Sequence, residues 1–246
     1  SISNTKGHNM KTVAVFGCSF SEGVNTLEIH KSKNNWPLFL SQKLNDCKVY
    51  NYAIGATSID YMLEKLLEYK YENPNSICVF QATKPHRFTR EVSRIDLNEK
   101  WQTNKKFSTE NYLKLDKENL VRITGGTQIA PADFNNDKEC KKILKFIKSY
   151  YDNYDNMHQS LQFNSYVSMA SHVADFCYIH TRNANQSYQQ NIKSGYYGKY
   201  FTDIPCVNEI LGHKFTEFSQ DEGNHFNIDG NKWVAAWVYN NIKDLL

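Results

Sequence analysis

The chain has 246 residues, a formal net charge of +3 and a mean hydropathy of -0.64. This length suits a single α/β domain, which can bury a sizeable core without disulfide bonds. The weak charge disfavours nucleic acid as a partner. No apolar run approaches the roughly 20 residues that a membrane-spanning helix needs. The sequence leaves the oligomeric state open.

The N-terminal residues and the cysteines bear on cellular location. Residues 1–9 lack the apolar core of a secretory signal, and we interpret them as a tag or a short disordered arm before Met10. The six cysteines are widely spaced and form no C-x-x-C pair, which is typical of reduced, buried thiols. With a composition typical of AT-rich genomes, these features predict a cytoplasmic or virion-associated protein.

The first third of the chain alternates predicted strands and helices. Lys11–Phe16 is a short apolar run that ends at a glycine, as expected of a buried parallel strand. Apolar residues at helical spacing predict helices over 36–44 and 59–71, and further apolar runs predict strands over 48–53 and 76–81. This order is typical of a parallel sheet with right-handed crossovers.

The rest of the chain is less regular. Residues 87–136 are polar and aromatic with weak periodicity, and the stretch is too long for a plain loop, so we interpret it as an insertion that caps a site. The elements expected after it are helices over 138–151 and 157–174, a strand over 176–180, a long loop over 181–205, a short helix or turn at Val207–Leu211, and a closing helix over 228–246.

Ser19 is the candidate nucleophile. It follows the first strand and Gly17, at the edge where parallel sheets present reactive groups. A serine hydroxyl needs a base, and His225, which precedes the closing helix, is the candidate. Glu222 lies three residues before this histidine and can share a loop with it, and Asp221 is the competing acid. The alternative is that Ser19 is an ordinary turn serine and His225 fills a polar niche.

These segments resemble the motifs of the SGNH (GDSL-like) hydrolases. The family's Gly-Asp-Ser block matches Gly17-Cys18-Ser19, with Cys18 in place of Asp. Its second block, Asn-x-Ala-x-Gly, matches residues 51–55. Its last block, Asp-x-x-His with a later glycine, matches residues 222–225 and Gly230, with Glu in place of Asp.

The resemblance implies a fold and a chemistry. The fold would be a flavodoxin-like three-layer α/β/α sandwich with a central parallel sheet, formed by residues 10–246 as one domain. The activity would be ester hydrolysis through an acyl-enzyme, with Glu222 orienting the imidazole of His225 and with no cofactor or metal. The amides of Ser19 and Gly55 would donate hydrogen bonds to the oxyanion.

The third block of the family departs from its pattern here. The family has Gly-x-Asn-Asp after the third strand, and that Asn donates to the oxyanion, whereas this chain has no Asn there. Gln81 or Thr83 is the candidate replacement, and Arg87 the candidate residue at the edge of the site. The departure matters because losing one oxyanion donor costs about 2.7–4 kcal/mol in a model protease.

The substrate and two rival functions follow from the same residues. The polar, aromatic insertions favour a hydrophilic small-molecule or glycan ester, such as an acetylated sugar, over a lipid. An acyltransferase would use the same Ser19 and His225 with an alcohol acceptor. A non-catalytic binding module is favoured by the missing Asn and by Cys18.

Overall fold

The fold is built on a parallel sheet of four short strands. The computed structural model describes residues 11–22, 34–53, 57–82, 88–91, 120–123, 145, 149, 156–180, 204–219 and 225–246. The sheet has the order β2-β1-β3-β6, and all three neighbouring pairs are parallel. Its strands are β1 (Lys11–Phe16), β2 (Cys47–Asn51), β3 (Ile77–Ala82) and β6 (Phe176–Ile179). Of the two inner strands, β3 is buried along its whole length, as expected for a parallel sheet covered on both faces.

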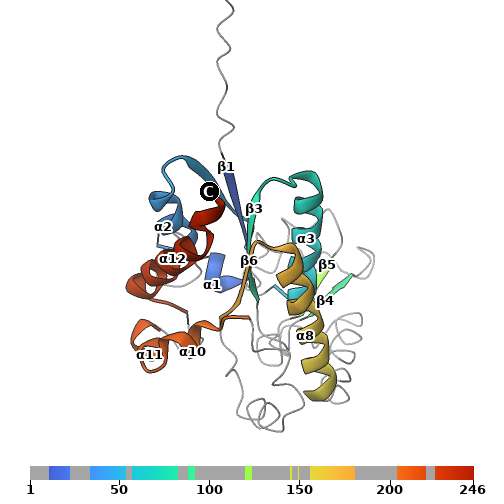
Figure 1. Cartoon of the computed structure of the whole chain (residues 1–246). Coiled ribbons are helices and arrows are strands. Elements are labelled where there is room, and N and C mark those ends of the chain that lie inside the picture. The colour runs from blue at the N-terminus through green and yellow to red at the C-terminus, as the bar shows by residue number, and fades with distance from the viewer. Residues whose placement is uncertain are drawn as a thin grey trace, which may run out of the picture.

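Helices cover both faces of the sheet, which lies between them in Figure 1. On one face α2 (Trp36–Lys43) packs beside α12 (Ile228–Ile242), although they come from opposite ends of the chain. On the other face α3 (Ile59–Glu72) packs on α8 (Asn156–Val173). Alternate residues of β1 enter the two cores, because successive side chains of a strand point to opposite faces. The predicted three-layer sandwich is thus confirmed.

Asparagines start the two helices that later prove to support the site. The Asn35 side chain accepts a hydrogen bond from Leu38 N at 2.9 Å, and Pro37 occupies the first turn of α2, where its missing N–H costs nothing. Asn227 caps α12 in the same way, accepting from Gly230 N at 2.9 Å. Each cap satisfies a backbone donor that the helix itself leaves without a partner.

Most predicted elements agree with the observed ones within two residues. The closing helix differs most: α12 ends at Ile242, four residues before its predicted end, and a 3₁₀ turn, Lys243–Leu245, follows it. Two short helices were not predicted: α1 (Ser19–Glu22) and α11 (Lys214–Phe218). The short helix expected at Val207–Leu211 is α10.

Part of the predicted insertion contains an antiparallel strand pair. β4 (Phe88–Glu91) pairs with β5 (Leu120–Ile123), in a sheet separate from the parallel one. The sequence did not predict these strands. Of the predicted helix over 138–151 only Lys145 and Ser149 are described, and both are helical. The loop over 181–203 and the arm over 1–9 lie outside the described residues.

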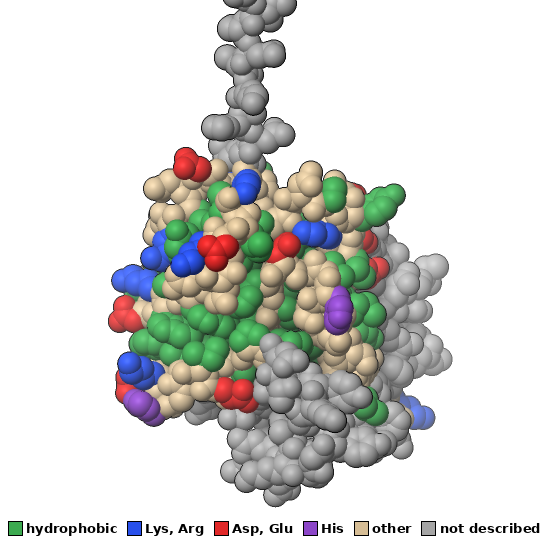
Figure 2. Space-filling view, in the orientation of Figure 1, with side chains coloured by type: hydrophobic (Ala, Val, Ile, Leu, Met, Phe, Trp, Pro, Cys, Tyr) green, Lys and Arg blue, Asp and Glu red, His purple; other side chains and the backbone are tan. Residues whose placement is uncertain are grey.

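Hydrophobic side chains are exposed on one face of the molecule. Figure 2 shows hydrophobic side chains gathering on the face where α12 and β6 lie, and the stacked rings of Trp233 and Trp237 belong to α12. Within the described ranges, no helix is both long and apolar enough to cross a bilayer.

The five described cysteines carry free thiols, as predicted. Burial raises the pKa of Cys177 to about 12 and that of Cys78 to about 11.

Candidate active site

Ser19 begins α1, the short helix that follows β1. Cys18 O accepts hydrogen bonds from Ser21 N and Glu22 N, both at 2.9 Å, which closes the turn. Gly17 makes room for it: a Cβ at this position would lie 2.8 Å from Gln81 Oε1 and 2.9 Å from Ser21 Oγ. The turn therefore requires glycine because of close approach, not because of its backbone angles.

His225 meets Ser19 at the carboxyl edge of the sheet. Its Nε2 lies 2.9 Å from Ser19 Oγ, although 206 positions separate the two residues. Ser19 is 8% exposed and His225 is half-buried, so the pair lies at the surface of the core with limited access to solvent. This distance is within the hydrogen-bond reach expected of a serine and its base.

The loop of His225 is fixed to the segment before it. Phe226 forms an antiparallel bridge with Ser219, and Asn227 N donates to Phe218 O at 2.8 Å. Gly230 allows this approach, since a Cβ there would lie 2.9 Å from both Phe218 O and Phe226 Cβ. The glycine that follows the histidine in the motif thus has a steric reason.

Aromatic rings surround the pair. Phe20 stacks on His180 with ring centroids 3.7 Å apart and contacts the ring of His225 at 4.9 Å. His180 is 2% exposed and also packs against Phe226 at 4.7 Å. His180, to which the sequence assigned no role, therefore lies behind Phe20 as part of the wall of the site.

Gln81 lies beneath the nucleophile turn. Its Oε1 accepts from Cys18 N at 3.2 Å and from Ser21 Oγ at 3.1 Å, while its Nε2 donates to Ala82 O at 2.7 Å. Gln81 is only 1% exposed. Both ends of its amide are engaged inside the protein, which argues against the oxyanion-donor role predicted for it and assigns it to support of the turn.

The other predicted site residues cannot be placed against this pair, because they lie outside the described residues. They are the candidate acids Glu222 and Asp221 and the candidate oxyanion or edge residues Gly55, Thr83 and Arg87. The amide of Ser19 is described, and no hydrogen bond within the described part of the chain occupies it. Of the two candidate backbone donors to the oxyanion, the amides of Ser19 and Gly55, only that of Ser19 belongs to a described residue.

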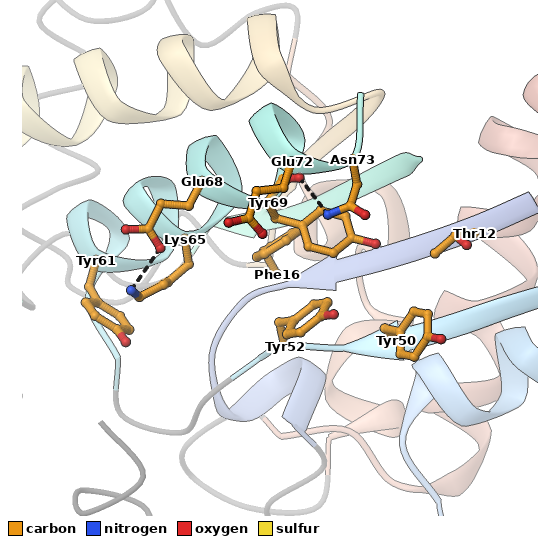
Figure 3. Close-up of a pocket in the computed structure, with 10 residues that line it drawn as sticks. All are labelled: Thr12, Phe16, Tyr50, Tyr52, Tyr61, Lys65, Glu68, Tyr69, Glu72 and Asn73. Carbon is orange, nitrogen blue, oxygen red and sulfur yellow. Dashed lines mark hydrogen bonds and ion pairs between the residues drawn. The ribbon is translucent and has the colours of Figure 1, made fainter. Parts of the chain in front are cut away.

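A groove lined with tyrosines runs between α3 and the sheet (Figure 3). It has a volume of about 640 Å³, and Tyr50 and Tyr52 on its floor are 44% and 41% exposed. Phe16 stacks on Tyr52 at 5.4 Å, and Lys65 lies over the ring of Tyr61 at 5.4 Å. Burial, then the neighbouring tyrosines, raise the pKa of Tyr52. Phe16 and Ser19 are three positions apart in the chain, so their Cα atoms lie within about 11 Å of each other.

Solved structures resemble the whole chain. The lipase/acylhydrolase from Enterococcus faecalis aligns with a TM-score of 0.50 at 11% identity, over 96% of this chain and 96% of that one. The chain shares the α/β/α fold of this lipase/acylhydrolase. TesA aligns with a TM-score of 0.49 at 14% identity, over 96% of this chain and 100% of its own. The esterase EstA from Pseudoalteromonas sp. aligns with 0.48 at 9%, over 95% and 97%.

The likeness is one of fold and not of sequence. No protein-family profile matches the chain, and no curated protein matches it. In this chain β1 leads to Ser19, and the segment before α12 carries His225. The reaction therefore has to be argued from the residues at this edge of the sheet.

Proposed function

We propose that this chain is a serine esterase that hydrolyses an acyl ester through an acyl-enzyme. The observation that carries the proposal is the 2.9 Å distance between Ser19 Oγ and His225 Nε2 at the carboxyl edge of a parallel sheet. A turn serine with only a structural role has no need of an imidazole at this distance. A hydroxyl paired with an imidazole has the geometry of an activated nucleophile.

The proposed reaction has two halves. Ser19 Oγ attacks the ester carbonyl while His225 Nε2 takes the hydroxyl proton, and the alcohol leaves with that proton. Water then attacks the acyl-serine ester and gives one proton to His225. The bond between the acyl carbon and Ser19 Oγ breaks, His225 returns its proton to Ser19 Oγ, and the carboxylic acid is released. The reaction consumes one water and needs no cofactor or metal.

Two further roles belong to the proposal. Glu222, or Asp221 in its place, holds the imidazole in the required orientation and stabilises its protonated form. The amides of Ser19 and Gly55 stabilise the oxyanion, with Thr83 as the third donor and Arg87 at the edge of the site. With Gln81 engaged elsewhere, Thr83 is the remaining side-chain donor of those that the sequence offers.

The proposed substrate is an acetyl ester of a carbohydrate. The tyrosine groove supports this choice, since half-exposed aromatic rings with hydroxyl groups offer both apolar faces and hydrogen bonds. Its charged residues are one lysine, Lys65, and two glutamates, Glu68 and Glu72, so its lining repels anions such as nucleic-acid phosphates. A neutral polyhydroxylated chain fits this lining.

Hydrolysis of p-nitrophenyl acetate, together with a fluorophosphonate probe of serine reactivity, tests the reaction. We expect the folded wild type to turn over the ester and to be labelled at Ser19, and the variants Ser19→Ala and His225→Ala to lose both signals. A wild type that is not labelled at Ser19 contradicts the proposal and favours a binding module. Faster product formation with a sugar acceptor, with the acyl group recovered on that sugar, favours an acyltransferase.

A second assay tests the carbohydrate. We expect Tyr52→Ala to raise KM for an acetylated oligosaccharide several-fold more than KM for p-nitrophenyl acetate, because the longer substrate alone reaches the groove. Tyr71→Ala is the matched control, since Tyr71 is 89% exposed and does not line the groove. Equal changes in the two KM values contradict the carbohydrate part of the proposal while leaving the esterase part intact.

A further inference from the structure

A buried hydrogen-bond network underlies the nucleophile turn. Ser21 and Gln81 are 0% and 1% exposed. Ser21 Oγ donates to Gln81 Oε1 at 3.1 Å and accepts from Trp36 Nε1 at 3.0 Å. The turn that carries Ser19 is therefore fixed from below by a strand residue and by the first residue of α2.

Trp36 extends this network away from the turn. Its indole donates to Ser21, and its backbone N–H donates to Asn231 Oδ1 at 3.1 Å. Trp36 is 1% exposed and lies in the core that α2 and α12 share. One residue thus holds the nucleophile turn with its side chain and α12 with its main chain.

Asn231 completes the connection to the histidine loop. Its Nδ2 donates to Phe226 O at 2.9 Å and to Asn227 O at 3.0 Å, the carbonyls of the two residues that follow His225. Asn231 is 8% exposed. Of the groups of this size, only a primary amide both accepts from Trp36 N and donates to the two carbonyls.

We propose that Asn231 is a positioning residue that, through Trp36 and Ser21, sets the distance between Ser19 Oγ and His225 Nε2. The two reacting groups come from opposite ends of the chain, and this network is a polar path between their loops. Displacements of about 1 Å in such a pair cost on the order of a hundredfold in rate, so fixing the two loops relative to each other has a kinetic consequence. The inference rests on the proposed function for its kinetic effect, but not for its geometric one.

Asn231→Asp is the principal test, because it keeps size and the acceptor for Trp36 N but removes both donations to the histidine loop. The geometric readout is the ¹⁵N signal of His225 Nε2, assigned by its loss in His225→Ala and calibrated with Ser19→Ala, which removes the hydrogen bond. We expect Asn231→Asp to move this signal toward its position in Ser19→Ala. The kinetic readout is a fall in kcat for p-nitrophenyl acetate of about tenfold or more, with KM within about twofold.

Two further variants separate positioning from other effects. Ser21→Ala adds no charge, removes the acceptor for Trp36 Nε1, and is expected to shift the same signal and lower kcat. Asn241→Asp is the matched control: Asn241 lies on the same helix, donates to Trp237 O at 2.8 Å and is exposed, so both readouts should stay at wild-type values.

The outcomes divide cleanly. An unchanged His225 Nε2 signal in folded Asn231→Asp overturns the positioning role, whatever its melting temperature. If Asn231→Asp does not fold, Ser21→Ala alone decides. If the wild type does not hydrolyse the ester but the variants still shift the His225 Nε2 signal, the positioning role is retained and the proposed function is overturned.

Discussion

The two sides of β1 differ in how their polar groups are satisfied. Beneath Ser19, the hydroxyl of Ser21 and the amide of Gln81 are buried and bonded to one another. In the groove along α3, Tyr50 and Tyr52 keep over two-fifths of their surfaces exposed. A closed network fixes one geometry, whereas an open aromatic surface accepts ligands by contact. The closed side therefore suits the proposed placing of reactive atoms, and the open side suits the proposed binding of a substrate.

The largest effect is expected from removing His225, the proposed base. His225→Ala should lower kcat/KM for p-nitrophenyl acetate by about 10⁴-fold or more, because the base is lost from the pair at 2.9 Å. Steady-state kinetics measure it, and unfolding by urea checks that the free energy of unfolding is retained. A loss of less than about tenfold in a folded variant means that His225 is not the base.

The next largest effect is expected in the free energy of unfolding at alkaline pH, where the two sides of β1 should contribute differently. Burial raises the pKa of Tyr178 well above the ordinary value of 10.0. Above pH 10 the unfolded tyrosine releases its proton while the folded one keeps it, so stability present below pH 10 is lost as pH rises. The loss is at most about 1.4 kcal/mol per pH unit for this one group.

The comparison of two phenylalanine variants isolates that loss. Tyr178→Phe should flatten the fall in the free energy of unfolding above pH 10 more than Tyr52→Phe does, because Tyr52 is partly solvated in the groove. Urea unfolding between pH 8 and 11 measures both, with the two variants compared at each pH. Equal slopes for the two variants contradict the distinction between a closed and an open side.

A steric variant tests the closed side at constant pH. Gly17→Ala places a Cβ 2.8 Å from Gln81 Oε1 and 2.9 Å from Ser21 Oγ, so the network has to move. We expect a loss of about 1–3 kcal/mol in the free energy of unfolding. Chemical denaturation measures it, with Gln42→Ala on the exposed side of α2 as control. Wild-type stability in Gly17→Ala means that the turn relaxes without cost.

The smallest effect is expected in the groove. Lys65 Nζ lies 3.0 Å from Glu68 Oε2, but the Glu68 side chain is 54% exposed. Removing the pair with Lys65→Ala should change the free energy of unfolding by at most about 1 kcal/mol. Thermal unfolding at low and high salt measures this change. A larger loss would mean that the groove is as tightly coupled as the region beneath Ser19.

The order of elements and the meeting of Ser19 with His225 were accessible from the sequence. Short apolar runs marked the strands, and a glycine-serine pair after the first strand marked the turn. The spatial expectation followed from parallel topology, because strand ends and the loop before the last helix share one edge. The catalytic roles and the single domain over 10–246 stay predictions.

The support of the site was not accessible from the sequence. Trp36 and Asn231 are 195 positions apart, and their hydrogen bond exists only once α2 and α12 pack together. No local pattern marks such a contact. Gln81 was noticed for its place after a strand, but whether its amide faces the substrate or the core depends on tertiary packing. The β4–β5 pair was missed because its strands are four residues each, too short for a period to be visible.

Gly230 has a consequence for how such chains change over generations. Because Gly230 has no Cβ, Phe218 O and the side chain of Phe226 can lie close to the start of α12. The bend of the loop thus depends on Gly230, whereas the proposed proton transfer depends on His225. A descendant that exchanged His225 for an inert residue while keeping Gly230 would retain the outline of the loop and lose its reactivity.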